Sequence, residues 1–185
     1  MSAMDVPAVL RVNGKEYAVL HLLGKGKGGY TWLAERDGAR YALKQIHHEP
    51  CDYYQFGDKL AAELRDHQRL SALRVPIPAL LDVDRAAERL LKELIPGETI
   101  YQLVLRDALE PWHLEQVRSL SGALRAHGLN LDWFPTNFMC RDGTLYYVDY
   151  ECNGYMDQWS FEEWGVRYWS RTPDFDAYAK EHGDL

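Results

Sequence analysis

The chain has little of what several large protein classes require. Its three cysteines, Cys51, Cys140 and Cys152, are odd in number and form no Cys-x-x-Cys pair, which disfavours both a disulfide framework and a zinc site. Basic residues are outnumbered, and the net charge of −7 argues against nucleic-acid binding or a basic membrane-surface domain. No apolar run is long enough to span a bilayer, and the first residues do not have the pattern of a signal peptide. We therefore expect a cytoplasmic protein with reduced thiols and without nucleic-acid or membrane partners.

Hydrophobic residues make up 46% of the 185 positions, which is enough for one core, built as one body or as two small lobes. The first third favours antiparallel strands, because Asn13-Gly14 and Asp37-Gly38 are hairpin dipeptides that interrupt strand-forming segments. Apolar residues then recur at helical spacing over 54–73, and Pro76 and Pro78 must end that helix. The other expected elements are strands over 79–83, 89–94 and 145–148 and helices over 99–109 and 111–127.

A glycine-rich segment joins two of the expected strands. Gly24, Gly26 and Gly29 form a G-x-G-x-x-G pattern, and Lys44 lies on the strand that follows. Glycines let a backbone approach phosphates without a Cβ in the way, and a neighbouring lysine can neutralise phosphate oxygens. A dinucleotide-binding site needs these glycines to open a helix, whereas strand formers follow Gly29, so that interpretation is disfavoured. A phosphate-binding hairpin and a plain hairpin turn both remain.

Two further polar features follow the strand of Lys44. Glu63 lies beside the inward face of the helix expected over 54–73, where it is either an ordinary surface glutamate or the partner of Lys44. The His47-His48-Glu49 cluster near Cys51 matches no known metal-ligand spacing, and a solvated loop is the favoured interpretation.

Downstream, Asp132 and Asn137 share one loop, and Asp149 comes at the end of the next expected strand. This combination can position an acceptor hydroxyl and hold divalent cations against a triphosphate. Common loop residues also produce such a pattern by chance, so its weight depends on the glycine-rich segment upstream.

In order and spacing, the glycine-rich segment, Lys44, Glu63, the loop 132–137 and Asp149 resemble the motifs of the protein-kinase-like superfamily. This superfamily includes small protein kinases and the aminoglycoside and choline phosphotransferases. The resemblance implies an α+β, two-lobe fold in a single kinase-like domain over 1–185, with an antiparallel β N-lobe with one helix over 1–96 and a truncated helical C-lobe over 97–185. It also implies an ATP-dependent kinase that uses Mg²⁺ or Mn²⁺ and transfers phosphate to an unidentified hydroxyl acceptor, either a protein serine or threonine or a small molecule.

The resemblance also assigns roles by position. Catalytic roles fall to Asp132, which would orient or deprotonate the acceptor, and to Lys44 paired with Glu63. ATP would be bound by Gly24, Gly26, Gly29, Lys44 and the backbone of Glu93 and Ile95, and the metal ions by Asn137 and Asp149.

Several positions depart from the family pattern. Phe134 replaces a lysine that lies near the transferred phosphate, and Asn130-Leu131 replaces His-Arg, so control by a phosphorylated activation loop is not expected. Lys92, at the back of the implied adenine pocket, is expected to extend outward along its methylenes. These departures keep open a nucleotide-binding pseudokinase that acts as a scaffold or regulatory partner. We favour the phosphotransferase, because the loop aspartate and both metal ligands are present.

After Asp149 only residues 150–185 follow, too few for the helices that complete a standard kinase C-lobe. Phe161, Trp164 and Tyr168 have helical spacing and predict a terminal helix whose rings cover the core of the small lobe. An aromatic substrate or partner surface is the alternative, and a homodimer is one way to close apolar surface that the short lobe leaves exposed.

Overall fold

The computed structural model describes residues 7–49 and 57–183. By its internal contacts the chain divides into two units. Unit 1 takes in residues up to 64 together with 78–94, and unit 2 takes in 65–77 and 95–185. One dividing line falls inside helix α1 (Lys59–Ala72), and another follows Leu94.

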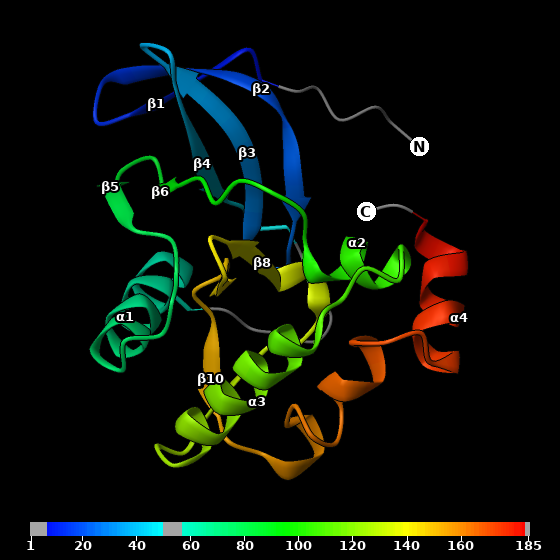
Figure 1. Ribbon diagram of the computed structural model, residues 1–185. Coiled ribbons are helices and arrows are strands. Elements are labelled where there is room, and N and C mark those ends of the chain that lie inside the picture. The colour runs from blue at the N-terminus through cyan, green and yellow to red at the C-terminus, as the bar shows by residue number, and fades with distance from the viewer. Residues whose placement is uncertain (1–6, 50–56, 184–185) are drawn as a thin grey trace. The chain divides into compact units, whose positions relative to one another are not determined.

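Unit 1 is built on a six-stranded antiparallel sheet with the strand order β1-β2-β3-β4-β6-β5, drawn in blue to green in Figure 1. Both predicted hairpins are confirmed, since Asn13 and Asp37 adopt positive φ angles of 47° and 52°. Register shifts between β2 and β3 mark bulges, which increase the local twist of the curled sheet. The strands are β1 (Val9–Val12), β2 (Lys15–Lys25), β3 (Gly29–Arg36), β4 (Ala39–Ile46), β5 (Leu80–Asp84) and β6 (Arg89–Glu93).

Each face of this sheet contributes to a separate cluster of buried apolar side chains. Trp32, Leu43 and Leu91 are buried in a cluster on one side. Ile46 and Leu90 form a second cluster with Leu60, from the first turn of α1. The predicted helix over 54–73 is confirmed from Lys59 onward, and residues 54–56 lie outside the described residues.

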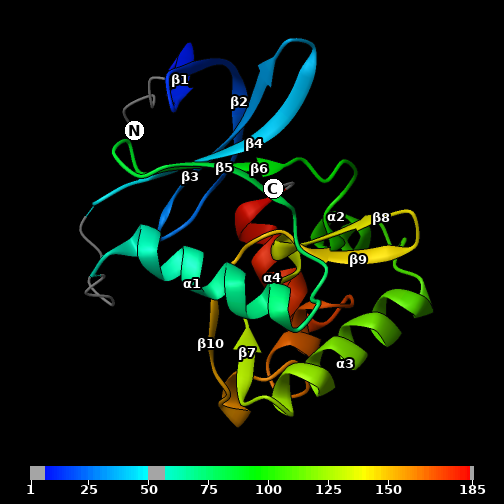
Figure 2. The same cartoon turned by 90° about the vertical axis from the view of Figure 1, so that its left-hand side faces the viewer.

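Unit 2 contains helices and two small antiparallel sheets, in which β7 pairs with β10 and β8 pairs with β9. The helices predicted over 99–109 and 111–127 are confirmed as α2, which ends already at Leu105, and α3, and the strand predicted over 145–148 is confirmed one residue earlier. Thr99 caps α2, and Pro111 opens α3. In Figure 2, α3 runs alongside the strands that it contacts, β7 and β9. The elements are α2 (Ile100–Leu105), α3 (Pro111–Arg125), β7 (Leu129–Leu131), β8 (Phe138–Arg141), β9 (Thr144–Tyr147), β10 (Cys152–Gly154) and α4 (Pro173–His182), with short 3-10 turns η1 (Pro135–Asn137), η2 (Asp157–Trp159) and η3 (Gly165–Tyr168).

The terminal helix predicted over Phe161, Trp164 and Tyr168 is wrong in its position. The Val166 amide donates to the Phe161 carbonyl five residues back, and the Arg167 amide donates to the Trp164 carbonyl three residues back. The segment therefore does not keep the repeated i→i−4 hydrogen bonds of a regular α-helix. The segment forms a hydrogen-bonded turn followed by the 3-10 turn η3, and the terminal helix is α4. Phe161 nevertheless packs into the core of unit 2, as the expected covering role required.

The observed architecture is therefore α+β, with a curled antiparallel sheet and a few helices. Within the described part of the chain, no helix combines the length and the apolarity needed to cross a bilayer.

Candidate functional site

Residues 26–28 form the turn between β2 and β3, called here the glycine turn. All three of its carbonyls are held: Nε2 of His47 lies 3.0 Å from the Gly26 oxygen, and the His47 amide donates to the Gly28 oxygen at 3.2 Å. Lys59, which is only 7% exposed, donates to the Lys27 oxygen at 3.3 Å and to the His47 oxygen at 2.6 Å. The backbone of the turn is thus fixed through its acceptors.

Two backbone amides of the glycine turn, in contrast, have no such partner among the described residues. Within residues 7–49 and 57–183, the amides of Lys27 and Gly28 donate to no protein acceptor. Gly24, Gly26 and Gly28 have no positive φ, and a Cβ at any of them would meet nothing within 4 Å. The fold therefore does not require glycine at these three positions. Unpaired amides in a turn without side-chain obstruction can bind phosphate oxygens.

Gly29 was assigned to ATP binding with Gly24 and Gly26, but the packing of the sheet by itself requires a glycine at this position. A Cβ there would lie 2.5 Å from the carbonyl oxygen of Gln45 on the adjacent strand. Glycine at this position allows β3 and β4 to pair closely at the start of their ladder.

Lys44 and Glu63 form a buried ion pair in unit 1. Nζ of Lys44 lies 2.8 Å from Oε2 of Glu63, and the two side chains are 11% and 9% exposed. Lys44 lies opposite Thr31 in the β3–β4 ladder, close along the sheet to the glycine turn. The predicted pairing is confirmed, and the surface interpretation of Glu63 is wrong. Its other oxygen, Oε1, is buried without a hydrogen-bond partner in the described residues.

In unit 2, the loop that follows β7 is closed by its own polar groups. The exposed Asp132 accepts a hydrogen bond from the Phe134 amide through Oδ1 at 3.1 Å, and Nδ2 of Asn137 donates to the Asp132 carbonyl at 3.2 Å. These bonds orient the Asn137 amide so that its Oδ1 is the atom left for a cation.

Asn137 directly precedes β8, and Asp149 follows the end of β9 by two residues, so both lie at the same open end of the β8–β9 hairpin. Phe138 pairs with Tyr147, and the Val148 amide donates to the Asn137 carbonyl at 2.9 Å, which places Asn137 beside the residue before Asp149. Carboxylate and amide oxygens are ligands that Mg²⁺ prefers, so this pair suits a hard cation. The described residues contain no group of three or more His, Cys, Asp or Glu side chains arranged to hold a metal.

Tyr147 connects these acidic residues, and the sequence alone did not identify it. Its hydroxyl donates to the Glu151 carbonyl at 2.8 Å. Burial raises the pKa of Tyr147 well above its ordinary value, and the charges of Asp149, Asp132 and Glu151 raise it further, against a backbone hydrogen bond from Asp132. The phenol therefore stays neutral among these carboxylates. Its inward position two residues before Asp149 on a strand was the available signal.

The departures noted above have packing roles in unit 2. The ring of Phe134 lies 4.7 Å from that of Tyr178 and 5.1 Å from that of Tyr168, between centroids. Asn130 donates to the Trp159 carbonyl and accepts from Nε1 of Trp133, both at 2.6 Å. Phe134 and Asn130 therefore support the packing of aromatic side chains in unit 2.

The segment assigned to adenine recognition begins at the end of β6. The Glu93 amide donates to the Ala79 carbonyl at 2.8 Å, and its carboxylate accepts from the Ala79 amide at 3.1 Å. Ile95, with which the second segment of unit 2 begins, is buried. Lys92 is only 3% exposed, so the expected outward extension of its side chain is wrong.

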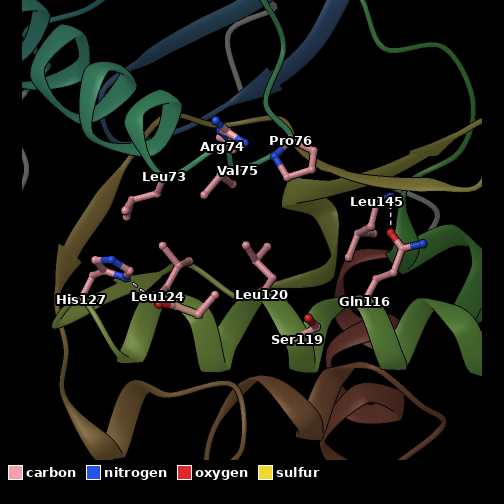
Figure 3. Close-up of a pocket in the computed structure, with 11 residues that line it drawn as sticks. Leu73, Arg74, Val75, Pro76, Gln116, Ser119, Leu120, Leu124, His127 and Leu145 are labelled. Atoms are coloured by element: carbon pink, nitrogen blue, oxygen red, sulfur yellow. Dashed lines mark hydrogen bonds between the residues drawn. The ribbon is translucent and has the colours of Figure 1, made fainter.

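A cavity of about 310 Å³ lies within unit 2, between the C-terminal end of α1 and α3 (Figure 3). Leu73, Val75 and Leu120 make it largely apolar, and Gln116 uses its amide group on the backbone of Gly143 and Leu145. None of the residues predicted to bind ATP lines this cavity.

No model of a known protein family matches this chain, and neither does any curated protein sequence.

Proposed function

We propose that the chain is an ATP- and Mg²⁺-dependent phosphotransferase of the protein-kinase-like superfamily, with a hydroxyl group of a protein or small molecule as acceptor. The observation that carries the proposal is the buried Lys44–Glu63 pair at 2.8 Å. The glycine turn lies on the same sheet; its Lys27 and Gly28 amides donate to no acceptor in the described residues, and a Cβ at Gly26 or Gly28 would meet nothing within 4 Å. A lysine whose position is set by a buried carboxylate is suited to contact phosphate oxygens without a large loss of side-chain freedom.

The remaining roles are divided among the other candidate residues. The turn amides would bind outer phosphate oxygens, and the Glu93 and Ile95 backbone would bind adenine. Asn137 and Asp149 would hold Mg²⁺, which supplies charge neutralisation on the phosphates when bound. Asp132 would orient the acceptor hydroxyl and take its proton. Because phosphoryl transfer depends mainly on positioning and charge, these polar groups would supply what the chemistry needs.

The packing of Phe134 among aromatic rings favours a second candidate, a nucleotide-binding pseudokinase that acts as a scaffold or regulatory partner. A lysine at this position would add charge near the transferred phosphate, and none is present. Under this alternative, Mg²⁺-ATP would bind and raise the melting temperature through linkage, while no phosphate would be transferred.

Calorimetric titration with Mg²⁺-ATP tests the binding step that both candidates share. We expect Lys44→Met to weaken ATP binding at least about tenfold. Lys15→Met removes a lysine from a more exposed ion pair with Asp82 and should leave the affinity unchanged. ADP release in the same samples then separates the candidates, because only a phosphotransferase produces it. Absence of any ATP binding by the unmodified protein would refute both.

A further inference from the structure

Glu49 connects the two strands that flank the glycine turn. Its Oε2 lies 2.8 Å from Nζ of Lys25, the last residue of β2, and its Oε1 accepts a hydrogen bond from the hydroxyl of Tyr30. Lys25 and Tyr30 face each other in the β2–β3 register, and the Lys25 ammonium lies 5.0 Å from the centre of the Tyr30 ring. Glu49 therefore forms an ion pair with the ammonium group of Lys25, which is the β2 residue next to the glycine turn.

This contact is charged but weakly held. The hydrogen bond to Glu49 raises the pKa of Lys25, and the hydrogen bonds from Lys25 and Tyr30 lower the pKa of Glu49, so both groups are ionised at neutral pH. Their side chains are 48% and 47% exposed, and exposed ion pairs of this kind contribute little net stability. A more highly charged anion can therefore displace Glu49 from Lys25 at low cost.

Lys27 adds a second ammonium group at the tip of the same turn. Its side chain is exposed, whereas its carbonyl is fixed by Lys59. Its amide and that of Gly28 have no acceptor within the described chain. The ammonium groups of Lys25 and Lys27, together with two amides that donate to no described residue, favour an anion with several charged oxygens over a single phosphate.

We propose that Lys25 and Lys27 bind the polyphosphate of the nucleotide, and that Glu49 competes with the phosphates for Lys25. The inference rests on the proposed nucleotide-binding function and specifies its ligand preference and its regulation. Lys25 and Lys27 supply positive charge for the phosphate oxygens. Glu49 lowers the affinity until a triphosphate outcompetes it.

The test is a set of calorimetric titrations with Mg²⁺-ATP, inorganic tripolyphosphate and AMP. Lys27→Gln and Lys25→Gln should each weaken ATP and tripolyphosphate binding by about two- to tenfold and leave AMP binding unchanged. Glu49→Gln should tighten ATP binding about two- to fivefold, because the amide can still accept from Tyr30 but no longer holds the Lys25 charge. The same substitution should have no effect in the Lys25→Gln background.

Matched controls separate this effect from a change in net charge. Glu16→Gln removes one negative charge from an exposed ion pair with Arg11, and Lys15→Gln removes one positive charge, both on β2 away from the turn. Neither should change ATP affinity, and all variants should keep the melting temperature of the unmodified protein.

The possible failures are distinguishable. If the unmodified protein binds Mg²⁺-ATP but Glu49→Gln tightens binding equally with and without Lys25, competition by Glu49 is refuted while the proposed function stands. ATP binding that is insensitive to both lysine substitutions would overturn the inference in the same way. Absence of binding to Mg²⁺-ATP and to tripolyphosphate would refute the inference and the proposed function together.

Discussion

At the scale of single residues, the glycines of one segment serve different purposes. Gly29 is required by the fold, because the Gln45 carbonyl occupies the space of its missing Cβ. Gly26 and Gly28 have open space around them and no positive φ, so the fold leaves them replaceable. A sequence pattern treats all of them alike, and only the surrounding backbone distinguishes a glycine needed for packing from one available to a ligand.

We expect Gly29→Ala to lower the free energy of unfolding by about 1–3 kcal/mol, since the added methyl group would overlap the backbone of β4. Gly28→Ala should leave stability within about 0.5 kcal/mol of the unmodified protein and weaken Mg²⁺-ATP binding instead. Urea unfolding and calorimetry on the two variants measure these effects. Equal stability loss in both would contradict the distinction between the two glycines.

The described cysteines are expected to be unreactive at neutral pH. Burial raises the pKa of Cys140 and of Cys152 from 9.0 to about 11. Because only the thiolate reacts, the native protein should be alkylated at these sites about 100-fold more slowly at pH 7.5 than ordinary thiols, and faster as the pH rises toward 11. Iodoacetamide labelling followed by peptide mass spectrometry measures each site. Rates equal to those in guanidinium would show that the thiols are not protected.

At the scale of helices and strands, the elements that depend on residues nearby in the sequence could be predicted, whereas strands that pair with a distant segment could not. Asn13-Gly14 and Asp37-Gly38 specify their hairpins within a few residues, and α3 carries its own Pro111 start. Strands β7 and β10 were missed, because each has three residues and gains its partner only from a distant part of the chain. Phe161, Trp164 and Tyr168 have helical spacing, but their segment makes i→i−5 and i→i−3 hydrogen bonds and ends in a 3-10 turn, so spacing alone predicted a helix that does not form.

The β7–β10 pair offers a matched test of this packing. Asn130 and Asn153 face each other in the register, but only Asn130 is buried between the Trp133 indole and the Trp159 carbonyl. Asn130→Ala leaves both groups without a partner and should lower the free energy of unfolding by about 2–4 kcal/mol. Asn153→Ala, at an exposed site, should change it by less than about 0.5 kcal/mol. Chemical denaturation that gives equal values would refute the role assigned to Asn130.

At the scale of the whole molecule, the Lys44–Glu63 pairing was predictable from the sequence, and the residues that support the candidate site were not. Lys44, Glu63 and the Asp132 loop could be identified from residue type and order, and the structure shows the Lys44–Glu63 pair directly. Lys59, which fixes the glycine turn, and Tyr147, which lies among the acidic residues, became apparent only from their contacts. The type of a residue indicates which chemistry it can perform. Which other residues hold it in place depends on distances in the folded chain, and spacing along the sequence does not determine these.

Mg²⁺-ATP should stabilise the protein by linkage, by about 2.7 kcal/mol at a concentration 100 times the dissociation constant. The shift should disappear in Lys44→Met when that variant is compared with its own ligand-free form. Thermal unfolding with and without nucleotide measures it. An unchanged shift in Lys44→Met would show that Lys44 does not contribute to nucleotide binding.

Phosphoryl transfer itself is the most direct test of the central claim. The protein is incubated with Mg²⁺ and ATP labelled in the γ-phosphate, and label is followed into inorganic phosphate and into the protein. We predict slow transfer by the unmodified protein, lost in Asp132→Ala and in Asp149→Ala while both variants remain folded. Transfer at the same rate in both variants, or no transfer by a protein that binds Mg²⁺-ATP, would contradict the assignment of a phosphotransferase.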